Sequence, residues 1–263
     1  MSSIVTEQGL LHYESTGQGS PVVLLHCWLG SWALWHQSMT YLGHFHRTYA
    51  LDFWGFGESG KKHPTYAVSD YVEQVRQFMD QLGIRSAPIV GHSMGGTVAL
   101  SFALKYPEKV RKVAVVGSPI AGWSLNPFLI AAGFRPLAAL AYNSPNLFRM
   151  ALRIATPIIS KHPGWYDMQV RDLSRTTLSS FFASIASVRR TDLRPVLKNI
   201  DMPVMGIYGK SDNIVNPNQH AVLRKAVPHA QIALFEKSAH FPMLDEPEHF
   251  NRTLRKYLSE QAA

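Results

Sequence analysis

Three residues of types that can cooperate in nucleophilic catalysis, Ser93, Asp212 and His240, occur in that order along the chain. Ser93 is the serine of a Gly-x-Ser-x-Gly pattern at residues 91–95. A serine hydroxyl is a weak nucleophile until a neighbouring histidine takes its proton, and that histidine needs a carboxylate to fix its tautomer and stabilise its charged form. These three side chains can therefore attack a carbonyl carbon, provided that the fold brings them together.

The residues around Ser93 predict a strand, a sharp turn and a helix. Residues 87–90 are the apolar run Ala-Pro-Ile-Val, and residues 97–104 form an Ala- and Leu-rich run that is typical of a helix. This is the context that a nucleophile elbow requires. The flanking glycines allow the strand and the helix to pack closely behind a strained serine, so we expect Ser93 to lie on a tight turn.

Asp212 and His240 each follow an apolar run that predicts a buried strand, at residues 203–209 and 231–235. Loops at the ends of adjacent parallel strands can bring side chains together from distant positions in the sequence. We therefore expect Asp212 to orient His240, and His240 to act as the base for Ser93. The alternatives are a turn or helix-capping role for Asp212 and an ordinary polar loop position for His240.

Stabilisation of a developing oxyanion needs two backbone N–H groups. One is expected from Met94, which follows Ser93, and the second from the loop after the early apolar run, residues 26–30. Trp28 is the natural donor in that loop, and its ring could also line an acyl pocket. The alternative is that Trp28 belongs only to the core.

The remaining pattern predicts a parallel sheet with helices on both faces. Further strands are expected at residues 10–15 (an edge strand), 21–26, 48–52 and 110–117, and helices at about 33–43, 69–82 with Ser69 as the N-cap, 217–226 and 247–258. Between residues 118 and 195 the strand pattern is absent and prolines interrupt helical runs. We therefore expect a core domain of residues 1–118 and 196–263, with an inserted helical segment, 119–195, over the carboxyl ends of the strands.

Composition excludes several classes of protein. The chain has 263 residues and a net charge of +8, with nine Lys/Arg and three Asp in residues 119–195. These basic residues alternate with apolar ones and match no nucleic-acid motif, so we expect no nucleic-acid partner. No apolar run has the length of a membrane span, and residues 1–7 do not resemble a signal peptide. Cys27 is the single cysteine, which excludes an internal disulfide and fits the cytoplasm.

These motifs together resemble the α/β-hydrolase superfamily, in the branch with a helical cap after the sixth strand. The match covers residues 10–118 and 200–258, and includes the His-x-Trp loop at 26–30, the Asp-x-x-Gly-x-Gly-x-Ser loop at 52–59 and Ala-His-Phe-Pro at 239–242. The resemblance implies a mostly parallel eight-stranded sheet, a triad of Ser93, Asp212 and His240, and loop-shaping roles for Asp52 and Ser59. It implies neither a metal nor an organic cofactor.

Within this superfamily, the His-x-Trp loop and the Ser-Met pair resemble aryl esterases and cofactor-free perhydrolases. The family usually has glycine at the position of Cys27, so we expect a less extreme turn there.

The apolar runs at 128–134 and 137–142, with Phe181 and Phe182, favour a small hydrophobic ester of an acyl or aryl group as substrate. We expect hydrolysis of such esters through an acyl-enzyme. One alternative is hydrolysis or elimination at a carbon–carbon bond by the same triad. Another is a ligand receptor that keeps the fold without turnover. Contact of the inserted segment with a membrane surface would be weak, without stable insertion.

Overall fold

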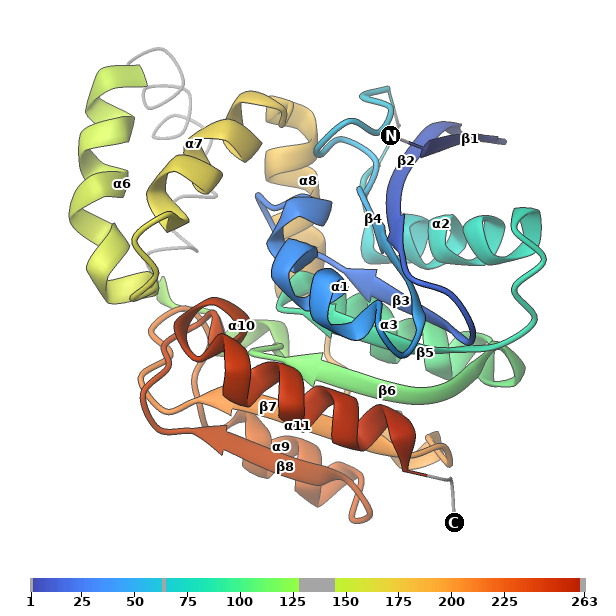
Figure 1. Cartoon of the computed structure of the whole chain (residues 1–263). Coiled ribbons are helices and arrows are strands. Elements are labelled where there is room, and N and C mark those ends of the chain that lie inside the picture. The colour runs from blue at the N-terminus through green and yellow to red at the C-terminus, as the bar shows by residue number, and fades with distance from the viewer. Residues whose placement is uncertain (1, 63–64, 128–144, 261–263) are drawn as a thin grey trace.

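A computed structural model describes residues 2–62, 65–127 and 145–260 of the chain. Eight strands within these ranges form one sheet in the order β1-β2-β4-β3-β5-β6-β7-β8 (Figure 1). Their bounds are β1 Ser2–Thr6, β2 Gly9–Thr16, β3 Pro21–Leu25, β4 Arg47–Leu51, β5 Ala87–His92, β6 Val110–Val116, β7 Val204–Gly209 and β8 Gln231–Phe235. The expected eight-stranded, mostly parallel sheet is confirmed.

The sheet is antiparallel at one end and parallel elsewhere. β2 pairs antiparallel with both β1 and β4, and every other neighbouring pair is parallel. The strand predicted at residues 10–15 is confirmed as β2, but its predicted position at the edge of the sheet is wrong, because β1 pairs with it on the outer side. The Ser2–Thr6 strand was not predicted because a strand at the edge needs few apolar residues, and even its Val5 is 75% exposed.

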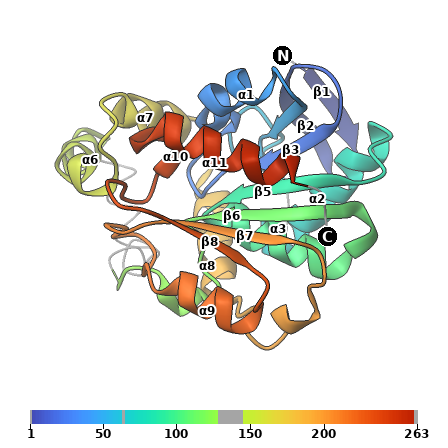
Figure 2. The same cartoon turned by 60° about the horizontal axis from the view of Figure 1, so that its bottom comes forward.

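Helices cover both faces of the sheet (Figure 2). α1 and α11 lie together on one face, while α2 and α3 pack against each other on the opposite face with α9. The bounds of these helices, and of the short helices between them, are η1 Trp32–Trp35, α1 His36–Leu42, α2 Val68–Gln81, α3 Met94–Lys105, η2 Pro107–Lys109, α9 Gln219–Ala226, α10 Pro242–Asp245 and α11 Pro247–Ser259.

The central strand β3 is covered on both faces, which explains why its sequence is continuously apolar. Val23 and Leu25 belong to the apolar cluster that contains side chains of α2 and α3, whereas Val22 and Leu24 belong to the cluster that contains those of α1 and α11. Because successive side chains of a strand point to opposite faces, a strand covered on both sides needs apolar residues at every position.

The segment between β6 and β7 contributes helices at the carboxyl ends of the strands. Figure 1 shows α6 and α7 beyond the arrowheads of β6 and β8. The bounds in this segment are η3 Gly122–Ser124, α6 Pro145–Ile159, α7 Trp165–Ser174, α8 Leu178–Arg190 and η4 Leu197–Asn199. The apolar runs 128–134 and 137–142 lie outside the described residues. Among the helices of the described ranges, none combines the length and the apolarity that a membrane crossing demands.

Helix α2 begins differently from the prediction. Its first residue is Val68, so Ser69 lies inside the helix and is not its N-cap. The carboxylate of Asp70 instead accepts a hydrogen bond of 2.7 Å from the backbone N–H of Ala67, which satisfies one of the free donors at the helix start. The helix ends at Gln81 with Leu82 as its C-cap, and Gly83 follows with a φ of 65°, as expected of a glycine that stops a helix.

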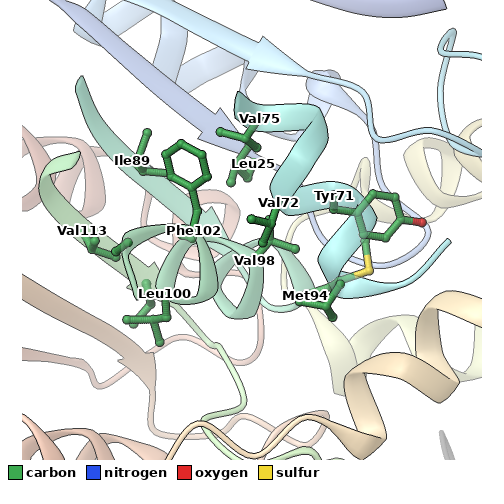
Figure 3. Packing of buried hydrophobic residues seen from close by; sticks show 14 of the residues in the cluster. Leu25, Tyr71, Val72, Val75, Ile89, Met94, Val98, Leu100, Phe102 and Val113 are labelled. Carbon is green, nitrogen blue, oxygen red and sulfur yellow. The ribbon is translucent and has the colours of Figure 1, made fainter. Parts of the chain in front are cut away.

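The start of α3 approaches the sheet so closely that only glycine fits. A Cβ atom on Gly95 would lie 2.4 Å from the carbonyl oxygen of Leu25 and 2.6 Å from that of His26. The helix is buried behind this contact, where Met94, Val98 and Phe102 lie in one cluster with residues of α2 and β5 (Figure 3). This packing fixes the position of the residue before the helix, Ser93.

Substitution of Gly95 by alanine tests this close approach. We expect Gly95→Ala to lower the free energy of unfolding by about 1–3 kcal/mol, because backbone atoms must move to admit the methyl group. The matched control is Ser101→Ala, on the same helix at a half-buried position, which should stay within about 0.5 kcal/mol of the wild type. Chemical denaturation gives both values, and equal stability of Gly95→Ala and wild type would contradict the packing argument.

A buried network around Asp52 shapes the loops that follow β3 and β4. Asp52 is inaccessible to solvent, and its carboxylate accepts hydrogen bonds from His12 Nδ1 at 2.9 Å, Trp32 N at 2.7 Å and Glu58 N at 2.8 Å. The hydroxyl of Ser59 donates to the backbone oxygen of Asp52 at 2.6 Å. Asp52 and Ser59 therefore have the loop-shaping positions that the sequence predicted.

The buried pair of Asp52 and His12 makes stability depend on pH. Burial opposes the charged form of His12, but hydrogen bonding and charge from Asp52 outweigh it and raise the pKa of His12 above its ordinary 6.5. Burial likewise opposes ionisation of Asp52, but the hydrogen bond from His12, with the other donors, lowers the pKa of Asp52 below 3.8. The pair therefore stabilises the fold fully between pH 3.8 and pH 6.5, the ordinary pKa values of Asp52 and His12. This stabilisation is lost as pH rises through the raised pKa of His12 or falls through the lowered pKa of Asp52.

Replacement of His12 by glutamine, which keeps a donor but cannot be charged, tests this pair. We expect the wild type to exceed His12→Gln in free energy of unfolding by more at about pH 5.5 than at about pH 9, because the wild-type histidine loses its proton over that interval. Denaturation curves of both proteins at each pH measure the difference. A difference that does not change with pH would contradict the charged pair.

Candidate active site

Ser93 lies on the strained turn that its sequence context predicted. Its φ is 52° and its ψ is −117°, a conformation that residues with a side chain rarely adopt. Two close approaches hold the turn: the Ser93 N–H donates to Val116 O at 2.8 Å, and a Cβ atom on Gly91 would lie 2.2 Å from Gly95 O. Ser93 is 6% exposed, at the carboxyl end of β5.

Asp212 and His240 meet at the neighbouring strand ends. Nδ1 of His240 donates a hydrogen bond of 2.8 Å to Oδ2 of Asp212, and both side chains are buried. Oδ1 of Asp212 accepts from the N–H groups of Ile214 and Val215 at 2.8 and 2.9 Å, so the carboxylate is held on both oxygens. This arrangement leaves Nε2 as the imidazole nitrogen available for proton transfer.

His92 connects the serine turn to His240. Its Nε2 donates a hydrogen bond of 2.8 Å to the backbone oxygen of His240, and the two rings lie 4.7 Å apart. Burial lowers the pKa of His92 well below its ordinary value, so the ring is neutral with its proton on Nε2. The expected packing role of His92 thus includes a specific contact. The backbone N–H of His240 also donates to Ile159 O, at the end of α6, at 3.3 Å.

The structure therefore brings Asp212 and His240 into direct contact, with Ser93 adjacent through His92. Within the described part of the chain, no direct hydrogen bond joins the Ser93 hydroxyl to His240. Hydrogen bonds of this kind are often long in proteins without a bound substrate and shorten when the reacting complex forms.

The loop with Trp28 abuts the start of α3. Since a Cβ atom on Gly95 would lie 2.6 Å from His26 O, the backbone of the 26–30 loop and that of Met94 are neighbours. Neither the Trp28 N–H nor the Met94 N–H donates a hydrogen bond within the described residues, so both can donate to a ligand. The indole N–H of Trp28 donates to Phe181 O at 3.1 Å, and the two rings lie 4.6 Å apart.

The strained position in this loop is Leu29, with a φ of 57°, and Cys27 is not among the residues with positive φ. This agrees with the expectation that the backbone at Cys27 is less extreme than a glycine would allow. Cys27 is buried, and burial raises the pKa of its thiol, so it has the character of a packed residue and not of a reactive thiolate. His26 shapes the loop by accepting from Phe53 N at 2.9 Å.

Gly117 is a site residue that sequence reasoning missed. It follows β6 with a φ of 52°, and a Cβ atom there would lie 3.2 Å from His240 Nδ1 and 3.3 Å from Asp212 Oδ2. A glycine at the last position of the strand predicted at 110–117 was the available signal. Its meaning depends on which loops meet above it, and the sequence does not show that. Within the residues that the structure describes, no group of three or more His, Cys, Asp or Glu side chains is placed to hold a metal ion.

Curated relatives match nearly the whole chain. The pimeloyl-acyl-carrier-protein methyl ester esterase of Vibrio vulnificus strain YJ016 is 29% identical over 253 residues, which are 94% of this chain and 97% of that protein. A protein of the same name from Aliivibrio fischeri strain MJ11 is 26% identical over 270 residues, covering 96% and 98%.

Solved structures show the same fold. An esterase from Exiguobacterium antarcticum superposes with a TM-score of 0.84 at 23% identity, covering 98% of this chain and 99% of that one. An enol-lactonase from Burkholderia xenovorans gives a TM-score of 0.83 at 20% identity, covering 98% and 100%. A family sequence profile described as the alpha/beta hydrolase fold matches residues 20–188. The chain belongs to the α/β-hydrolase family.

Proposed function

We propose that this protein is a serine hydrolase that cleaves carboxylic esters through an acyl-enzyme, with Ser93, Asp212 and His240 as its catalytic triad. The observation that carries the proposal is the buried 2.8 Å hydrogen bond between His240 and Asp212 beside a serine with a φ of 52°. Neither feature is needed for a stable sheet, and together they supply an oriented base next to a nucleophile held on a strained turn. Esterase relatives at 26–29% identity support the same reaction.

In the first half of the reaction, Ser93 Oγ attacks the ester carbonyl while His240 Nε2 takes its proton. Asp212 stabilises the resulting imidazolium through Nδ1. The tetrahedral intermediate collapses when His240 returns the proton to the leaving alcohol. In the second half, His240 takes a proton from water, the water oxygen attacks the acyl carbon, and the acid leaves as Ser93 regains its proton.

The oxyanion of each tetrahedral intermediate is assigned to the backbone N–H groups of Met94 and Trp28. Both groups are free of protein acceptors in the described residues and belong to backbone segments that touch. Donors that are already oriented cost no reorganisation as charge develops, and removal of one such donor costs roughly 10²–10³ in kcat. In this proposal the 26–30 loop takes part in catalysis through the N–H of Trp28.

We propose that residues 119–195 act as a cap and that the substrate carries a hydrophobic acyl or aryl group. The half-buried rings of Trp28, Phe181 and Phe182 lie in contact where the cap meets the oxyanion loop, and such surfaces suit an apolar group. The proposed location is the cytoplasm, from the single buried Cys27.

A second substrate candidate follows from the curated relatives. Their name describes hydrolysis of a methyl ester on a pimeloyl chain that is attached to an acyl-carrier protein. Exposed arginines of the proposed cap, Arg149, Arg153, Arg189 and Arg190, offer positive charge that would attract an acidic carrier. The ester chemistry is the same in both candidates, and the difference lies in what holds the acyl chain.

Removal of the nucleophile tests the reaction. Ser93→Ala should lower kcat for hydrolysis of a p-nitrophenyl ester by about 10⁴-fold or more, because no other group can form the acyl-enzyme. Ser101→Ala is the matched control, and circular dichroism with thermal unfolding checks that both variants fold. Retained activity of purified Ser93→Ala would overturn the proposal. Turnover of vinylogous diketones without turnover of esters would favour carbon–carbon bond cleavage, and a single slow turnover would favour a receptor.

A panel of p-nitrophenyl esters tests the substrate class. If the cap encloses the acyl chain, kcat/KM should rise by about fourfold for each methylene that the pocket buries, until the pocket is full. A profile that is flat or falls from acetate onward would contradict a hydrophobic acyl pocket. A separate assay uses a pimeloyl methyl ester, free and on an acyl-carrier protein. Faster, salt-sensitive hydrolysis of the carrier-bound form would select the second candidate.

A further inference from the structure

A buried polar contact ties the loop with Trp28 to the segment between β6 and β7. Ser31 directly follows this loop, and its Oγ donates a hydrogen bond of 3.0 Å to Oδ1 of Asp172 on α7. Ser31 is 2% exposed and Asp172 is 0% exposed. Burial of a carboxyl group is costly unless the group is well hydrogen-bonded. The triad mechanism assigns no role to Asp172, so it does not explain why this carboxyl group is buried there.

The two oxygens of Asp172 are bonded unequally. Oδ1 accepts from Ser31 and also from Arg171 Nε at 3.0 Å, whereas Oδ2 is buried and has no hydrogen-bond partner within the described ranges. The Arg171 side chain is 44% exposed, so solvent screens its ion pair. Burial raises the pKa of Asp172 above its ordinary value. Because both bonds converge on Oδ1, an uncharged group with a carbonyl oxygen at that position can accept both of them.

The loop needs such external contacts because its backbone is strained. Leu29 has a φ of 57°, and a residue held in this region persists only where its surroundings determine it. Asp52 holds the chain just after the loop from the core, through the N–H of Trp32. Asp172, on α7, holds the preceding residue, Ser31.

We infer that Asp172 is a positioning residue for the oxyanion loop. Through Ser31 it keeps the loop in the conformation that presents the Trp28 N–H to the substrate, and it acts without touching the substrate itself. The same contact makes the geometry of the oxyanion site depend on the seating of α7. This inference rests on the proposed function, because it assigns Asp172 a role in the reaction at Ser93.

Variants of both partners test the role. Asp172→Ala and Ser31→Ala should each lower kcat for p-nitrophenyl ester hydrolysis by at least about tenfold, because a displaced donor fails in the transition state. KM should change by less than about twofold, since the ground state gains little from the oxyanion contact. Asp172→Asn should keep kcat within about threefold of wild type, because its amide oxygen replaces Oδ1. The Ser31→Ala, Asp172→Ala double variant should be no slower than the slower single variant.

The control is Ser187→Ala, which deletes another hydroxyl between this segment and the core: Ser187 Oγ accepts from Val68 N at 3.0 Å. This variant should keep wild-type kcat. Wild-type kcat in Asp172→Ala, or an equal loss in Asp172→Asn and Asp172→Ala, would overturn the inference. If Asp172→Ala does not fold, Ser31→Ala and Asp172→Asn give the same decision. Retained activity in Ser93→Ala would instead refute the proposed function itself.

Discussion

The left-handed backbone at Ser93 is the constraint around which the structure is arranged. A residue with a side chain at a φ of 52° is strained by on the order of 1–3 kcal/mol, so the surroundings must hold it. They do so because β5 and α3 approach at Gly91 and Gly95 more closely than any side chain would permit. The helix is in turn fixed by a core that is apolar on both sides of the parallel sheet. Stability of the sheet thus supports a turn that the chemistry requires.

The same edge of the sheet collects every group assigned to the reaction. Asp212 follows β7 and His240 follows β8, two strands that pair in parallel, so their loops leave the sheet side by side. A third loop, after β6, contributes Gly117, whose missing side chain leaves room for the bonded pair. His92 then ties the backbone of His240 to the serine turn. The side chains are therefore placed by strand order, and their final orientation is set by hydrogen bonds between loops.

Local patterns were sufficient to predict the parts that local patterns determine. The strand, serine and helix around Ser93 could be read because composition and spacing change within a few residues, and the pairing of Asp212 with His240 follows from parallel strands. The β1 strand was missed because only one of its five residues, Thr6, is buried, and Ser69 was misassigned because Asp70 supplies the cap. The contact of Ser31 with Asp172 joins residues 141 positions apart, and no property of either neighbourhood indicates it.

Reaction with a fluorophosphonate is the most direct test of the central claim, that Ser93 is a nucleophile activated by His240. Such a reagent forms a stable phosphonyl ester only with a serine whose hydroxyl is deprotonated as it attacks. Intact-protein mass spectrometry with peptide mapping should find one phosphonyl group, on Ser93, and His240→Gln should slow its formation by about 10³-fold or more. Absence of labelling, labelling at another residue, or an unchanged rate in His240→Gln would contradict the claim.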